Sequence, residues 1–117
     1  YREAFDSYRM AMRLNPHYPA WYVWKLGTAY YDARQYENAV LPLKEAIERN
    51  PKFKRARLAL AATYAQLDRI EDAEQQVDEL LADHPDASLQ QESRWKTEDV
   101  EWLEHWLEGL RKAGLPE

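Results

Sequence analysis

Residues 20–51 of this chain read AWYVWKLGTAYYDARQYENAVLPLKEAIERNP, and residues 54–85 repeat the pattern as KRARLALAATYAQLDRIEDAEQQVDELLADHP. A leucine, a tyrosine and an alanine recur in register, and each stretch ends on a proline. Pro16, Pro51 and Pro85 are spaced by 35 and 34 residues. A fixed period near 34 residues predicts repeated pairs of helices, in which one pair alone is too small to bury its apolar face.

Each half of the repeat has the periodicity of an amphipathic helix, with apolar or small residues at i, i+3 or i+4, and i+7. These residues are Val23, Leu26, Gly27 and Tyr30 in the first half, and Ala39, Leu43, Ala46 and Ile47 in the second. Small residues at such positions predict a close approach of two helix axes, with a tyrosine filling the space beside them. Residues 1–16 match only the second half.

Composition narrows the possible functions. A chain of 117 residues suits one folding unit with its own core. Cysteine is absent, so disulfides and thiolate metal sites are excluded, and we expect a reducing, cytoplasmic location. The net charge of −5 argues against nucleic acid as a partner. No apolar run approaches the ~20 residues of a membrane span, so we expect no membrane contact by this segment.

The spacing of Leu26, Gly27, Tyr30, Ala39, Leu43, Ala46 and Pro51 resembles the tetratricopeptide repeat (TPR). The resemblance implies an all-α solenoid of antiparallel helix pairs, with a concave face lined by the first helix of each pair. We expect the second helix of a truncated repeat in 1–16, repeats in 20–51 and 54–85, and a short helix plus a C-terminal capping helix in 86–117. We also expect that the chain is a fragment of a longer protein.

The tail and one proline carry local predictions. Ser88 begins a capping box for a short helix. Thr97 is expected to cap a longer helix that has Glu98 and Asp99 in its first turn and ends at Gly114. The expected apolar stripe of that helix is Val100, Leu103, Leu107 and Leu110, which we expect to cover the last repeat. Pro42, inside a predicted helix, should produce a kink and leave the Asn38 carbonyl without its usual partner.

The TPR resemblance implies a peptide groove on the first helices. Tryptophan and tyrosine give large contact area with little loss of entropy, so they are good anchors for a bound peptide. The alternative is that these aromatic residues pack against a neighbouring repeat. The groove candidates are Trp21, Trp24, Thr28, Tyr31, Arg55, Leu58 and Ala62.

Three other groups of residues give weaker indications of function. Trp102 and Trp106, together with Trp95, either cover the last repeat or form a self-association surface. Glu101 and His105 are four residues apart on one predicted helix face and could offer two metal ligands, but such pairs are common by chance. The basic cluster from Lys52 to Arg57 could attract an acidic peptide or form a solvated surface. We predict no catalytic residues, no metal and no cofactor.

A second resemblance is narrower. The stretch from Leu14 to Tyr22 and the ending from Leu107 to Glu117 are similar to the C-terminal TPR region of a bacterial family. That family joins TPR units to a class III adenylate/guanylate cyclase or to a winged-helix DNA-binding domain. The resemblance implies a regulatory or scaffolding module in a larger bacterial signalling protein, with Glu117 at or near the C-terminus. The alternative function is an oligomerisation or spacer element of a TPR-containing transcriptional regulator.

Overall fold

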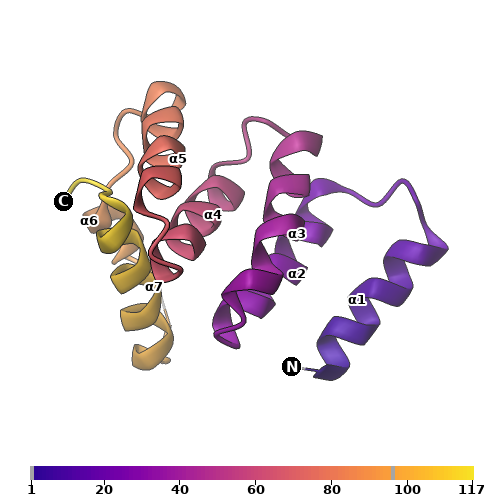
Figure 1. Cartoon of the computed structure of the whole chain (residues 1–117). Helices are drawn as coiled ribbons and strands as arrows, with labels where there is room; N and C mark the ends of the chain where they lie inside the picture. The colour runs from indigo at the N-terminus through magenta and orange to yellow at the C-terminus, as the bar shows by residue number, and fades with distance from the viewer. Residues whose placement is uncertain (1, 96) are drawn as a thin grey trace.

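The computed structural model of the chain describes residues 2–95 and 97–117, and their side chains from residue 5 onward (Figure 1). Of the expected 1–16 segment, Tyr1 and the side chain of Ala4 therefore lie outside the described residues. Within these residues the secondary structure is helical, and no strand is present. The helices are α1 (Arg2–Leu14), α2 (Ala20–Asp32), α3 (Tyr36–Arg49), α4 (Lys54–Gln66), α5 (Ile70–Asp83), α6 (Leu89–Glu92) and α7 (Val100–Ala113).

The helices pack as antiparallel pairs stacked in chain order (Figure 1). α2 packs on α3, α4 packs on α5, and α3 packs on α4 to join the two pairs. α1 packs against α2 from the other side. Pro16, Pro51 and Pro85 all lie in the connections that follow α1, α3 and α5. The predicted all-α solenoid is therefore confirmed.

Small residues allow the close packing that the sequence predicts. A Cβ added at Gly27 would lie 2.6 Å from the Leu43 side chain and 3.4 Å from the Leu43 backbone nitrogen. The first distance is far shorter than carbon–carbon van der Waals contact, whereas the second is an ordinary contact. Ala39 and Ala73, which occupy the same position in the two repeats, are fully buried. The glycine and the alanines thus set how closely α2 approaches α3 and how closely α4 approaches α5.

The two helix pairs also turn in the same way. Arg34 and Asp68, which are 34 residues apart, both adopt left-handed backbone conformations, with φ of 62° and 60°. The backbone N–H of the next residue donates to the carbonyl of Tyr30 in one pair and of Tyr64 in the other, at 2.9 Å in both. This is the Schellman type of helix ending, in which glycine is usual. The packing of the pairs therefore holds two non-glycine residues in a strained conformation.

Pro42 lies inside α3, which continues on both sides of it from Tyr36 to Arg49. The helix does not break at the proline, although proline removes one backbone donor. The kink at Pro42 stays a prediction.

The C-terminal helix does not continue the solenoid. Of the two helices of the preceding pair, α4 packs more on the second helix, α3, than on the first, α2. By contrast, α7 packs mainly on α4, the first helix of the pair before it, and less on the second helix, α5 (Figure 1). α7 therefore covers the side of the last repeat that carries its first helix, which is also the side where the peptide groove was predicted.

Three details of the tail differ from the sequence predictions. α7 begins at Val100, because the Asp99 side chain, and not that of Thr97, accepts a hydrogen bond from the backbone of Trp102 at 2.9 Å. Glu98 and Asp99 therefore precede the first turn. Val100 is 62% exposed, so it is outside the apolar stripe. The other predicted stripe residues do pack on the repeats, since Leu110 is fully buried and Leu103 and Leu107 are partly buried. Docking on α4 also buries His105, Trp106, Gly109 and Ala113.

Two predicted helix ends are confirmed. The Ser88 side chain accepts a hydrogen bond from the backbone of Gln91 at 3.1 Å and so caps α6. The Gln91 side chain bonds Asp86 and Lys54, at 3.1 and 2.9 Å, and among the described residues it makes no return bond to the Ser88 backbone, so only the Ser88 half of the predicted capping box is present. Gly114 ends α7 with φ of 91°, a conformation that favours glycine. None of the helices described is long and apolar enough to cross a lipid bilayer.

Candidate functional site

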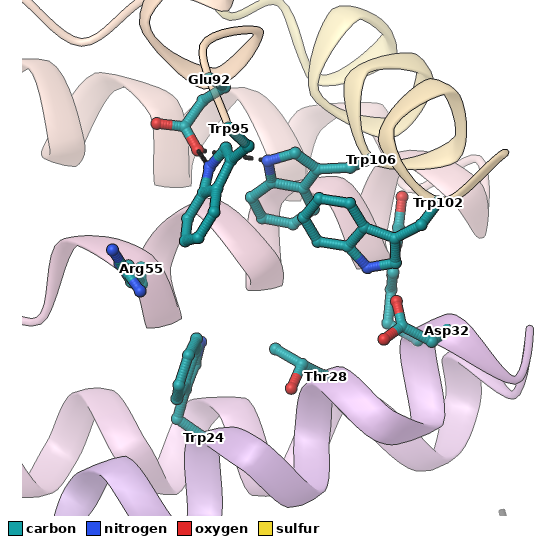
Figure 2. Close-up of a pocket in the computed structure, with 9 residues that line it drawn as sticks. Trp24, Thr28, Asp32, Arg55, Glu92, Trp95, Trp102 and Trp106 are labelled. Atoms are coloured by element: carbon teal, nitrogen blue, oxygen red, sulfur yellow. Dashed lines mark hydrogen bonds between the residues drawn. The ribbon is translucent and has the colours of Figure 1, made fainter. Parts of the chain in front are cut away.

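A pocket of about 210 Å³ lies between α2, α4, α6 and α7, and four indole rings line it (Figure 2). α2 contributes Trp24 to the wall, the loop after α6 contributes Trp95, and α7 contributes Trp102 and Trp106. The polar or partly polar residues of the wall are Thr28, Tyr31, Asp32, Arg55 and Glu92. The docking of α7 on the first-helix side thus converts an open face into an aromatic pocket.

Glu92 fixes two of the four indoles. Its carboxylate Oε1 accepts hydrogen bonds from Trp95 Nε1 at 3.1 Å and from Trp106 Nε1 at 3.2 Å (Figure 2). Glu92 is only 8% exposed, so these bonds form in a poorly solvated environment, where hydrogen bonds to a charged acceptor are strong. Trp102 stacks on Trp106, with ring centroids 6.3 Å apart and planes 13° apart. The upper wall of the pocket in Figure 2 is therefore held in one arrangement.

A cation already lies against one indole. The Arg55 guanidinium carbon is 4.4 Å from the centroid of the Trp95 ring, within the range of cation–π attraction. Arg55 is an exposed residue near the start of α4. Trp95 is thus in contact with a charged side chain of the same molecule, although 37% of its surface stays exposed.

Asp32, the last residue of α2, puts a second carboxylate at the pocket. Burial raises the pKa of the Asp32 carboxyl to about 6, and the Trp102 side chain and Arg34 act in the opposite direction. The ion pairs of the described chain do not include Asp32. Its charge is therefore poorly solvated, and the nearby cation, Arg34, donates to the Asp32 backbone carbonyl at 2.6 Å and forms no ion pair with the carboxylate.

Tyr31 and His105 join α2 to α7 beneath the pocket. Their rings stack with centroids 4.5 Å apart, and the Tyr31 hydroxyl donates to the His105 backbone carbonyl at 3.1 Å. His105 Nε2 and the Tyr36 hydroxyl form a hydrogen bond of 2.8 Å. Burial raises the pKa of the Tyr31 hydroxyl and lowers the pKa of the His105 imidazole. Both groups are accordingly neutral at pH 7.

The family model of the tetratricopeptide repeat matches residues 30–93, which is 64 of the 117 residues. The chain belongs to the tetratricopeptide repeat family. No curated protein matches it at a significant level. TPR domains are non-catalytic modules that bind other proteins, and the pocket of this chain lies at the first helices of its two helix pairs, α2 and α4.

The TPR fold brings most of the predicted site residues together. Trp24, Thr28, Tyr31 and Arg55 all line the pocket, and so do Trp102 and Trp106, which the sequence had placed in a separate group. Trp21 is 50% exposed and does not line this pocket. Whether any of these residues binds a ligand stays a prediction.

Leu58 and Ala62 differ from the expectation of an open groove. Both are buried, with 1% and 0% of their surface exposed. Ala62 packs beneath α7, since a Cβ added at Gly109 would lie 2.9 Å from its Cβ. The C-terminal helix thus takes the place that a groove ligand would have over this part of α4.

Asp32 and Glu92 were not among the predicted site residues, and Trp95 was grouped with Trp102 and Trp106 but not with the groove. Asp32 follows Thr28 by four residues, so the helical period that selected Trp24 and Thr28 also pointed to it. Glu92 and Trp95 lie outside the repeat, and their position depends on how the tail folds back. No periodic signal in the sequence reveals that fold-back.

Two further groups were singled out in the sequence, the Glu101 and His105 pair and the basic cluster from Lys52 to Arg57. His105 is buried, whereas Glu101 is exposed, and the residues described contain no group of three or more His, Asp or Glu side chains suited to a metal ion. In the basic cluster, Lys54 bonds Gln91 and Arg57 pairs with Glu79. These contacts account for much of the cluster as internal packing.

Proposed function

We propose that this TPR segment binds a short segment of a partner protein, which inserts a side chain into the pocket between α2, α4 and α7. The observation that carries the proposal is the gathering of four indoles around a space of about 210 Å³ on the first-helix side. Tryptophan is the residue type that most often dominates the energy of protein interfaces. A pocket whose walls are already ordered costs little further entropy on binding.

The accessible wall is formed by Trp24, Thr28, Asp32 and Arg55, together with the outward parts of Trp95 and Trp102. Leu58 and Ala62 lie under the tail, so the proposed ligand runs along α2 and the start of α4. This restricts the ligand to a short segment, because the rest of the first-helix side is covered by α7.

The proposal is tested by selecting peptides on the immobilised chain and measuring their affinity by calorimetry. Trp24→Leu should weaken a selected peptide at least tenfold, since it removes one wall of the pocket. Leu41→Ser is the matched control, because Leu41 is 76% exposed on α3 and does not line the pocket. Equal loss of affinity in both variants, or none in either, would contradict the proposal.

We further propose that the segment is the regulatory or scaffolding C-terminal part of a bacterial signalling protein, such as a class III adenylate/guanylate cyclase. The similarity of the stretches from Leu14 to Tyr22 and from Leu107 to Glu117 supports this context. In such a protein the segment would act in the cytoplasm. The test is to sequence the gene upstream of the codon for Tyr1. If that region encodes no cyclase domain and no winged helix, both expected kinds of parent protein are excluded.

Self-association is the second candidate, as part of an oligomerisation or spacer element of a transcriptional regulator. Met10 and Leu14 support it, because they are 54% and 79% exposed on α1. Trp102 and Trp106, the residues first suspected, face the chain's own pocket. Sedimentation over a range of concentrations tests this candidate, and a dimer that persists in Leu14→Ser would exclude the α1 surface.

A further inference from the structure

The aromatic pocket carries a charge pattern that selects its ligand, and this inference rests on the function proposed above. Four indoles form most of the wall, and Asp32 and Glu92 are both at its edge (Figure 2). Indole faces attract cations through the negative electrostatic potential above the ring, and tryptophan attracts them most strongly. We propose that the pocket accepts an alkylammonium group, the end of a lysine-type side chain of the partner, with Asp32 as its counter-ion.

The two carboxylates have different roles. Glu92 already accepts two indole N–H groups through Oε1, so it holds the wall in place. Asp32 makes no ion pair within residues 2–95 and 97–117, although it is half-buried at the pocket. Arg34 is near it, but its guanidinium donates to the Asp32 backbone carbonyl at 2.6 Å and leaves the carboxylate free to pair with a ligand. A charge in such a site is stabilised when an opposite charge enters. Asp32 is therefore the group that a cationic ligand would pair with.

The opposing charge is Arg55. It lies on the far side of the pocket from Asp32, against Trp95 (Figure 2). This contact demonstrates that the Trp95 ring holds a cation, but the same charge repels a second cation in the pocket. The two residues should therefore act on ligand affinity in opposite directions, Asp32 in favour of a cation and Arg55 against it.

The size of the space favours one side chain. At about 210 Å³ the pocket is smaller than the sites that usually hold drug-sized molecules. An anion would meet Asp32 and Glu92, and a neutral apolar group would leave the Asp32 charge without a counter-ion. An alkylammonium satisfies the indole faces and the carboxylate together.

The test uses choline chloride and its neutral isostere 3,3-dimethylbutan-1-ol, with sodium chloride at the same ionic strength as the reference. The indole N–H signals of Trp24 and Trp102 in ¹H–¹⁵N spectra report binding at the pocket. Choline should bind at least tenfold more tightly than the alcohol. Equal affinity for the two compounds would overturn the inference.

Two variants separate the charge from the shape of the pocket. Asp32→Asn should weaken choline binding at least fivefold, Arg55→Gln should strengthen it, and neither should change the affinity for the alcohol. Choline binding that is unaffected by Asp32→Asn would refute the role of this carboxylate. Trp21→Phe is the control, because Trp21 lies on α2 but does not line the pocket.

Failure of the alkylammonium site and failure of peptide binding give different results. A selected peptide that depends on Trp24, but binds equally well when its lysines are replaced by norleucine, would preserve peptide binding and exclude the alkylammonium site. Choline binding without any peptide partner would preserve the cation site and remove the peptide function.

Discussion

Gly109 lies where α7 packs tightly against α2 and α4, and Gly109→Ala should weaken the docking of this helix. The added Cβ would lie 2.9 Å from Ala62 Cβ on α4 and would contact the hydroxyl of Tyr31 on α2. Carbon atoms pack best at roughly 3.5–4.0 Å, so the methyl group does not fit without movement. Ala62 Cβ is fixed to its helix, and the Tyr31 hydroxyl is held by the His105 carbonyl.

The expected loss of folding stability in Gly109→Ala is the difference between two effects. Overpacking of a tight contact costs about 1–3 kcal/mol. Replacing glycine by alanine inside a helix gains about 1 kcal/mol of helix propensity. Because neither neighbour can move freely, we expect the upper part of the first range and a net loss of about 1–2 kcal/mol. For a chain of this size that lowers the melting temperature by about 4–8 °C.

Thermal and urea unfolding followed by circular dichroism measure this loss. The control is a double-mutant cycle with Tyr31→Phe, which removes the hydroxyl that the new methyl group would meet. The two changes together should cost less than the sum of their separate effects, since the second relieves part of the first. A Gly109→Ala variant as stable as the parent chain, or more stable, would refute the packing of α7 on α2 and α4.

Three further predictions concern stability. Burial raises the pKa of Asp32 from 3.8 to about 6, so ionisation of this carboxyl destabilises the fold. Asp32→Asn should therefore raise the urea midpoint at pH 7.5, and this gain should shrink as the pH falls through about 6 towards 4. A gain that is independent of pH would contradict this. Glu92→Ala leaves the indole N–H groups of Trp95 and Trp106 without their acceptor and should lower the free energy of unfolding in urea by about 2–4 kcal/mol. Glu92→Gln keeps an acceptor oxygen and should cost less. Equal costs for the two variants would argue against the shared acceptor. Pro42→Ala restores a backbone donor in the middle of α3 and should raise the thermal midpoint by an amount corresponding to about 1–3 kcal/mol, while an unchanged midpoint would mean that the helix has adapted to the proline.

The repeats could be predicted from the sequence because they rest on local patterns. Gly27 and Ala39 are small where two helices meet, and Tyr30 and Tyr64 recur at the same place in each repeat. Each feature repeats after one period, so two copies in one chain support the same interpretation.

The position of the tail could not be predicted in this way. Val100 fits the helical period of an apolar stripe, yet it is exposed, because α7 presents His105, Gly109 and Ala113 to the repeats instead. The face that a helix buries depends on what it docks against, and nothing in the repeat defines that partner surface for residues after 85. For the same reason the sequence placed Trp24 and Trp102 in separate sites, whereas the fold puts them in one pocket.

The central claim is that α7 lies across the first helices of the repeats and completes the aromatic pocket. Nuclear Overhauser spectra of the isotope-labelled chain test it directly. We predict cross-peaks from the Gly109 α protons to the Tyr31 ring and to the Ala62 methyl group. Their absence, with α7 giving cross-peaks only to α5, would contradict the claim.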